Sequence, residues 1–250
     1  MNSGLRRVGL VLLSAVGFVV AWGLVVAVGD YPEYILPSPQ VVAVRAVEAI
    51  QSGTLQPHLA ATLEESVIGF AVGATAAIAV GILLAKSLTA ERVLSPYLVA
   101  AQAIPILALA PLIDIWFGGG LTARVVICAL IVFFPIAIAT IVGIRSTDPL
   151  LVEMARANGA RGPQITRLLE IPSAMPVLFG GLRVGVTLAV IGAVVAEWAG
   201  ASVGLGVLIN IADQGLFDTP LMFVALGTLA LLGLTFYAVV LGAERVLVPR

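Results

Sequence analysis

The sequence VVICALIVFFPIAIATIVGI at residues 125–144 is followed at residues 145–172 by RSTDPLLVEMARANGARGPQITRLLEIP, and another apolar block begins after it. We call residues 145–172 the polar loop. It holds four Arg, three acidic residues and an Asn, although only 11% of the 250 residues are charged. Charged side chains are costly in hydrocarbon, so the sequence predicts that the polar loop leaves the membrane between two spans.

Composition predicts an integral membrane protein. Hydrophobic residues make up 60% of the chain and the mean hydropathy is +1.13, which is more apolar than a soluble domain can be. A helix needs about 20 apolar residues to cross about 30 Å of hydrocarbon. The first block is long for a signal peptide and is read as a retained helix. We predict one all-α domain, residues 1–250, with six transmembrane helices at about residues 8–28, 66–85, 93–113, 125–144, 173–196 and 219–243.

Charge placement predicts the orientation. With six crossings and the amino terminus inside, basic residues gather on the inner side, and the positive-inside rule then places both termini and the polar loop in the cytoplasm. The inner residues are Arg6, Arg7, Lys86, Arg92, Arg145, Arg156, Arg161, Arg167, Arg245 and Arg250. The outer side holds Arg45 and Arg124 with the acids Asp30, Glu33, Glu48, Glu64, Glu65, Asp213 and Asp218. The net charge of −1 gives no indication of nucleic-acid binding.

The polar loop itself predicts two short helices. Asp148 can cap a helix that begins at Pro149, where the missing amide hydrogen of proline costs nothing. Gly159 is expected to break this helix, and a second helix over residues 164–169 is expected to end at Pro172. That second helix would place Ile165, Leu168 and Leu169 on one side. An exposed apolar face rimmed by Arg predicts a docking surface, and an amphipathic loop folded against the membrane is the alternative.

The spacing within the loop resembles a known motif. Glu153, Ala155 and Gly159, followed by Ile171 and Pro172, resemble the cytoplasmic EAA loop of permease subunits in ATP-binding-cassette (ABC) importers. Met154, Leu169 and Ile171 depart from the motif, each by one apolar residue replacing another. The resemblance implies that a separate ATPase docks on this loop. The residues that it implies for this coupling are Glu153, Ala155, Gly159, Ile165, Leu168, Leu169, Ile171 and Pro172.

Further segments look like the taurine, alkanesulfonate and nitrate importer branch, which includes importers of riboflavin and of thiamine pyrimidine precursors. They are LPSP (36–39), APLIDIWFGGG (110–120), FFP (133–135), GIRSTDP (143–149) and GLRVGVTLAVIGAVVAEWAGASVGLG (181–206). The resemblance implies a type I, MetI-like permease in the bacterial cytoplasmic membrane. It implies a second permease copy, two cytoplasmic ATPases that bind ATP and Mg²⁺, and an extracytoplasmic substrate-binding protein. On this reading the chain is not an enzyme and holds no cofactor or metal of its own.

Three charged residues are candidates for the transport pathway. Arg183 lies inside the block 173–196, where a charge implies a polar lining, a paired partner or a side chain that reaches the headgroups. Glu197 and Asp114 end two spans on the outer side, where solvation at the interface is the alternative. Cys128 is expected to pack as a small hydrophobe, and His58 to be an interfacial residue and not a ligand.

Two outer segments carry helix signals. Ser38 and Pro39 predict the start of a short amphipathic helix at the outer interface. Residues 207–212 predict either a second short helix or a plain connecting loop.

One run of sequence bears on the cargo. The run at residues 187–202 favours riboflavin or a thiamine pyrimidine precursor, with alkanesulfonate, taurine or nitrate as the alternative. An ion-coupled secondary transporter is the alternative class, but the sequence shows no convincing inverted repeat, and the nearly uncharged spans argue against ion coupling. An intramembrane enzyme lacks a catalytic set in this sequence.

Overall fold

The computed structural model contains helices and connecting loops, and no β-strand, over the residues that it describes, 3–215 and 217–248. Arg250 lies outside the described residues, as do the side chains of Arg6 and Arg7. The helices are α1 (Ser3–Gly29), α2 (Pro39–Gln51), α3 (Leu55–Lys86), α4 (Leu88–Ala103), α5 (Ile106–Trp116), α6 (Gly120–Arg145), α7 (Pro149–Ala157), α8 (Gly162–Ile165), α9 (Ile171–Gly200), α10 (Leu205–Asn210) and α11 (Thr219–Leu247). Two π-helical turns, η1 (Thr166–Glu170) and η2 (Ile211–Gly215), precede α9 and follow α10.

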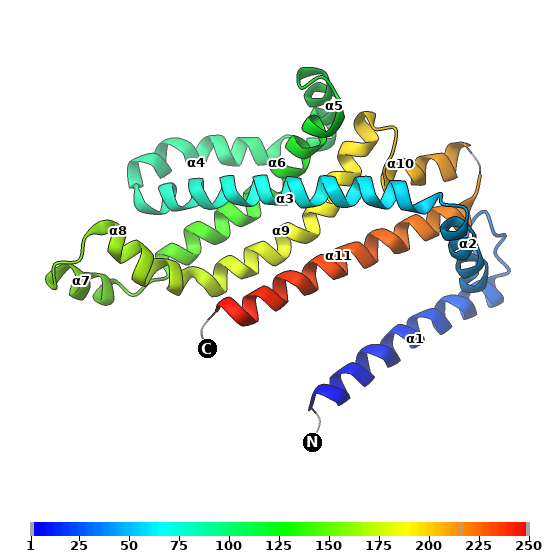
Figure 1. Ribbon diagram of the computed structural model, residues 1–250, viewed down its shortest axis with the longest axis horizontal. Helices are drawn as coiled ribbons and strands as arrows, with labels where there is room; N and C mark the ends of the chain where they lie inside the picture. The colour runs from blue at the N-terminus through cyan, green and yellow to red at the C-terminus, as the bar shows by residue number, and fades with distance from the viewer. Residues whose placement is uncertain (1–2, 216, 249–250) are drawn as a thin grey trace.

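Four helices of the described chain are long and apolar enough to cross a membrane: α3, α6, α11 and the continuous helical run Gly162–Gly200 that contains α9. They contain four of the predicted spans, so the all-α membrane fold is confirmed. Figure 1 shows α7 and α8 at one end of these helices and α2 and α10 at the other. We call these the loop end and the opposite end.

The predicted third span, residues 93–113, is not one straight helix. It is divided between α4 and α5, whose axes meet at 99°. The break falls at Ile104 and Pro105, both of which have extended backbone. Proline lacks an amide hydrogen and forces the residue before it out of the helical region, which explains the break. The prediction of a continuous third helix is therefore wrong.

The first predicted span, residues 8–28, lies within α1. Figure 1 shows that α1 diverges from the other helices as it runs from its α2 end toward the N-terminus. Trp22 of α1 stacks on Phe223 of α11, with ring centroids 5.6 Å apart. The predicted count of six spans is thus not matched by six straight spanning helices.

Close helix contacts form the centre of the molecule. α6 packs against both α3 and α9, and buried small residues such as Ala77 and Ala189 line the contact. Gly69 and Gly73 of α3 form a GxxxG pattern, and a Cβ added at Gly73 would lie 2.6 Å from the carbonyl oxygen of Ala129 in α6. Small residues at this spacing let two helix backbones approach closely inside a membrane.

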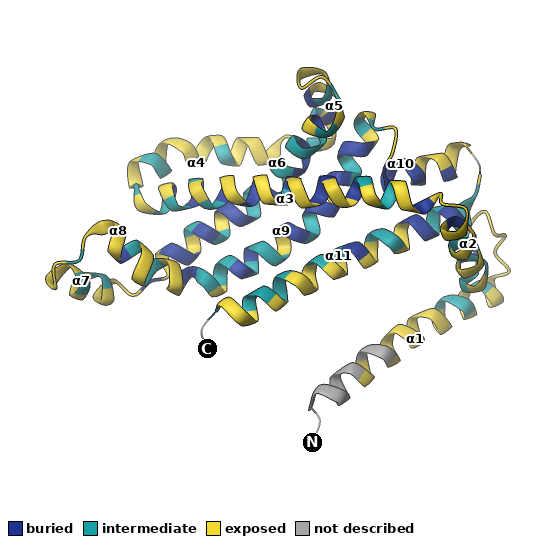
Figure 2. Ribbon diagram, in the orientation of Figure 1, coloured by how far each residue is buried: buried dark blue, intermediate teal, exposed yellow. Residues whose placement is uncertain are grey.

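Many large apolar residues on the long helices are exposed, and Figure 2 shows exposed residues along these helices. In soluble proteins such surface would be buried, whereas in a bilayer it contacts lipid or another membrane helix. Cys128 is fully buried within α6 beside α3 and α9, as its expected role as a small hydrophobe requires.

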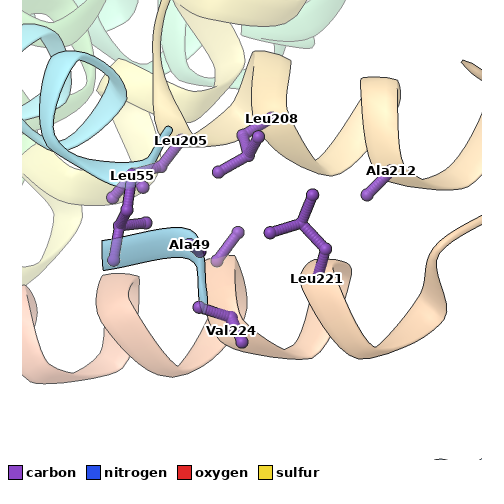
Figure 3. Packing of buried hydrophobic residues seen from close by; sticks show 8 residues of the cluster. Ala49, Leu55, Leu205, Leu208, Ala212, Leu221 and Val224 are labelled. Atoms are coloured by element: carbon purple, nitrogen blue, oxygen red, sulfur yellow. The ribbon is translucent and has the colours of Figure 1, made fainter. Parts of the chain in front are cut away.

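The opposite end has a separate apolar cluster, drawn in Figure 3, in which α2, α10 and α11 meet the start of α3. Ser38 caps α2 by accepting a hydrogen bond from the amide of Val41, so the predicted helix start is confirmed. α2 buries Ala49 in this cluster while Val44 and Val47 stay exposed. The segment 207–212, predicted as a helix or a loop, belongs to α10 and η2.

Candidate functional site

The first half of the polar loop folds as its residues predict. α7 begins at Pro149, and Asp148 Oδ1 accepts a hydrogen bond of 2.9 Å from the amide of Leu150. The chain leaves this helix at Asn158 and turns at Gly159, whose φ is +81°. Such a backbone conformation costs little for glycine and about 1–2 kcal/mol for other residues, so Gly159 is needed at this turn.

The second half differs from the prediction. α8 passes into the π-turn η1 and then directly into α9, so Pro172 does not end a helix. The amide of Ile171 donates to the carbonyl of Thr166, five residues earlier. Pro172 has no amide hydrogen and its ring crowds the preceding helical turn. We attribute the wider turn to this proline, because an added residue in the turn relieves the crowding without ending the helix.

The predicted common face of Ile165, Leu168 and Leu169 does not form. Ile165 is buried, Leu169 is half-buried and Leu168 is 70% exposed. A π-turn contains more residues per turn than an α-helix, so side chains three and four residues apart no longer share one stripe. The larger exposed apolar surface of the loop lies instead on α7, at Leu150, Leu151 and Met154.

The remaining motif residues lie at both ends of the loop. Glu153 and Pro172 are exposed, Ala155 is half-buried, and Ile171 is 37% exposed. Most residues of α7 are exposed, which is the arrangement that a docking surface requires.

Both ends of the polar loop are tied to the junction between α3 and α4, residues 84–91, which we call the corner. Arg145 donates hydrogen bonds of 2.7 and 2.6 Å to the two carboxylate oxygens of Glu91 and one of 3.1 Å to the carbonyl of Leu84. Lys86 forms an ion pair with Glu170 and donates to Thr166 Oγ1 at 2.5 Å. The loop thus leaves and re-enters the bundle at the same place.

At the opposite end, Glu197 holds the turn between α9 and α10. Its carboxylate is only 2% exposed and accepts hydrogen bonds of 2.5 Å from both the Thr62 hydroxyl and the amide of Gly206. The His58 ring contacts the carbonyl of Gly204 at 2.7 Å and the amide of Gly204 at 3.0 Å. A buried carboxylate with such partners serves to fix a loop.

A second buried carboxylate lies near it. Glu65 of α3, 1% exposed, forms an ion pair of 2.5 Å with Arg124 of α6. The sequence placed both residues outside the spans, whereas α3 and α6 extend beyond the predicted blocks and include them. An ion pair buried between two helices ties them together, because removing either partner leaves an unpaired buried charge.

The comparisons with known proteins identify the chain as a transporter component. A family model described as "Binding-protein-dependent transport system inner membrane component" matches residues 77–250. This chain belongs to that family. The match covers α4 to α11 and with them the whole polar loop. The protein is therefore the permease subunit of an ABC importer, and the resemblance seen in its sequence is confirmed.

Individual relatives and a solved structure agree with this assignment. The permease is 51% identical over 229 residues to the riboflavin transport system permease protein RibX of Chloroflexus aurantiacus, with 92% of this chain and 85% of that protein covered. It is 38% identical over 216 residues to the formylaminopyrimidine transport permease protein ThiX of Halalkalibacterium halodurans, covering 86% of each. An inward-facing MetNI methionine ABC transporter chain shares the fold, with a TM-score of 0.71, 22% identity, and 78% and 96% of the two chains covered.

The three pathway candidates of the permease do not come together. Arg183 of α9 pairs with Glu244 of α11 at 3.4 Å, which is the paired-partner alternative that the sequence left open. Glu197 is committed to the turn described above, and Asp114 of α5 lies half-buried against Gly200. A Cβ added at Gly200 would lie 2.7 Å from the Asp114 carboxylate.

Sequence reasoning missed the corner. Lys86 was read as an inner-side charge only and Glu91 was not singled out, because nothing in the local sequence links them to residues 54 to 84 positions further along the chain. The sequence did offer one signal: opposite charges lie at span ends on the same side of the membrane. Such ends can meet when the spans are antiparallel neighbours.

Proposed function

We propose that this permease carries riboflavin, or a chemically related heteroaromatic nutrient such as a thiamine pyrimidine precursor, into the cell. The observation that supports this cargo is the 51% identity to RibX across 92% of the chain. The relationship to ThiX, at 38% identity, supports the wider class of heteroaromatic nutrients. Import of an alkanesulfonate, taurine or nitrate by the same machinery is the competing hypothesis.

The proposal includes the rest of the assembly. Two copies of the permease form the pathway, two cytoplasmic ATPases dock on the polar loops, and an extracytoplasmic binding protein delivers the cargo. ATP and Mg²⁺ bind to the ATPases and not to this chain. The exposed apolar side chains of Leu150, Leu151 and Met154, with Arg156 beside them, support docking of a protein at the loop end.

Orientation follows from charge. The loop end carries Lys86, Arg145, Arg156, Arg161 and Arg167, whereas Arg45 lies in α2 at the opposite end. By the positive-inside rule the loop end faces the cytoplasm, and with it both termini. This orientation presents α7 to the compartment where ATP is available.

Transport requires two states that ATP distinguishes. ATP closes the ATPase dimer, the docked α7 helices move with it, and the spans open toward the outside; hydrolysis returns them. Only an interaction that differs between the two states can drive this exchange. The polar loop is the described segment that projects furthest from the bundle at the loop end and presents an apolar face (Figure 1).

Reconstitution tests the cargo directly. The permease is placed in proteoliposomes with its cognate ATPase and binding protein, and ATP-dependent uptake of radiolabelled riboflavin, an aminopyrimidine and taurine is compared. We expect uptake of riboflavin or the aminopyrimidine and none of taurine. Uptake of taurine alone would refute the heteroaromatic assignment, and uptake that follows an ion gradient without ATP would support the secondary-transporter class instead.

Two loop variants test the docking role. Gly159→Leu places a side chain in a left-handed backbone conformation, and Glu153→Lys reverses a charge on the exposed surface of α7. We expect both to abolish uptake while membrane insertion persists. Ala157→Leu, which places the same leucine side chain at an exposed helical position two residues away, is the control. Normal uptake by both variants, at equal expression, would contradict the assignment.

A further inference from the structure

The joint between the polar loop and α9 is a π-turn, and a single side chain spans it. Thr166 begins η1 and Glu170 ends it, and Lys86 contacts both: its Nζ donates to Thr166 Oγ1 at 2.5 Å and pairs with the Glu170 carboxylate. Lys86 is the last residue of α3. The end of α3 is thereby fixed to both ends of the turn through which the loop enters α9.

A π-turn is a weak point in a helix. Its hydrogen bonds join residues five apart, the geometry is rare, and such turns occur mostly as single distorted turns. Here Pro172 follows at once and offers no amide hydrogen to the preceding turn. Without an external contact, a force applied to the loop would bend this turn before it moved α9.

The contact made by Lys86 opposes such bending. Because its two partners lie at the start and the end of the turn, any bend changes at least one of the two distances. The Lys86 side chain is 35% exposed and the Glu170 side chain 13% exposed, so the ion pair is partly buried and loss of Lys86 leaves the Glu170 carboxylate without its cation. The contact therefore fixes the geometry of the turn as well as pairing a partly buried charge.

The end of the polar loop that joins α6 contains no π-turn. Arg145 is the last residue of α6, which continues as regular helix up to that residue and is already fixed by two hydrogen bonds to Glu91. Movement of α7 therefore reaches the bundle through two connections, residues 146–148 before it and residues 158–170 after it, and of these two only the second contains a π-turn.

We propose that Lys86 is a positioning residue for transport: it makes the π-turn a rigid joint, so that displacement of α7 by a docked ATPase moves α3 and α9 together. The proposal rests on the proposed function, because it assumes that an ATPase moves the polar loop. Loss of Lys86 leaves docking intact and lets the turn absorb the movement.

The test compares Lys86→Met with Lys86→Arg, which retains a charged donor, and with Arg45→Met. Arg45 pairs with Asp218 at 2.7 Å at the opposite end, so its removal controls for the loss of a partly buried ion pair. Each complex with the cognate ATPase and binding protein is placed in proteoliposomes, and molecules imported per ATP hydrolysed are measured. We expect Lys86→Met to copurify with the ATPase and to hydrolyse ATP. The number of molecules that it imports per ATP hydrolysed should fall by about 5-fold or more. Lys86→Arg and Arg45→Met should keep the wild-type ratio.

An unchanged ratio in Lys86→Met, beside active wild type, overturns the proposal and leaves the proposed function standing. If the wild-type complex itself shows no ATP-dependent import, the proposed function fails and this proposal fails with it. Hydrogen exchange of the peptide over residues 162–175 in the permease alone gives a second reading. Faster exchange in Lys86→Met than in Lys86→Arg supports the role of Lys86 in holding the π-turn, even where the complex does not assemble. Equal exchange in the two variants overturns that role.

Discussion

The close contact between α3 and α6 at Gly73 makes a quantitative prediction. In Gly73→Ala the new Cβ would lie 2.6 Å from the carbonyl oxygen of Ala129 and 2.9 Å from its Cα, whereas ordinary contact begins at 3.4 Å. The obstacle is backbone, so no side chain can rotate to make room. The two helices must separate by about 0.8 Å. Because the interior is densely packed, this separation loses contacts and costs free energy.

A matched variant isolates the packing effect. Gly180→Ala in α9 adds the same methyl group at a helical glycine where the new atom meets nothing within 4 Å. Both substitutions gain about 1 kcal/mol of helix propensity, so this gain cancels in the comparison. What remains at Gly73 is the cost of overpacking, about 1–3 kcal/mol.

The buried thiol of Cys128 supplies the assay. It is the single cysteine of the chain, and it lies in α6 against Gly69 of α3, one turn from Gly73. A maleimide dye that fluoresces on reaction with a thiol therefore reports when α3 and α6 separate on heating. At about 2–4 °C per kcal/mol for a chain of this size, Gly73→Ala should melt about 2–12 °C below Gly180→Ala. Equal midpoints would refute the close contact of α3 with α6.

Three further outcomes are expected. Glu197→Ala leaves the buried amide of Gly206 without its acceptor, so hydrogen exchange over residues 200–212 should accelerate roughly 5- to 150-fold, and wild-type exchange would contradict the role of Glu197 in the turn. Arg183→Met should melt below the double variant Arg183→Met/Glu244→Leu, since the single change leaves Glu244 unpaired; a double variant that melts lower still would argue against the pair. Asp114→Leu should alter the relative uptake of riboflavin and the aminopyrimidine if Asp114 touches the pathway, and an unchanged profile would remove it from the candidates.

Much of the fold was predictable because a bilayer imposes strong rules on sequence. Four spans were located from length and polarity alone, since uncharged runs of about 20 residues have few alternatives in a membrane. The helix starts at Pro39 and Pro149 were also predicted, because Ser38 and Asp148 carry local capping signals. The turn at Gly159 followed from the same local reasoning.

The failures came from proline and from distant contacts. Pro105 divides the predicted third span, whereas Pro172 was expected to end a helix and is instead absorbed by a π-turn. The same residue type gives either result, and the surrounding packing decides between them. The corner and the pair of Glu65 with Arg124 join positions far apart in the chain, and their pairing cannot be inferred without the helix arrangement.

The path of α3 explains how the loop end and the opposite end can act together. The helix runs for 32 residues, about 48 Å, and is packed along its length against α6 and α9. Its last residue, Lys86, holds the polar loop, and near its first turns Thr62 holds Glu197 and the amide of Leu205 at the start of α10. A helix held at both ends moves as one body, because bending it would break contacts with α6 that involve backbone as well as side chains. α3 is therefore one continuous helix that joins the polar loop to the start of α10.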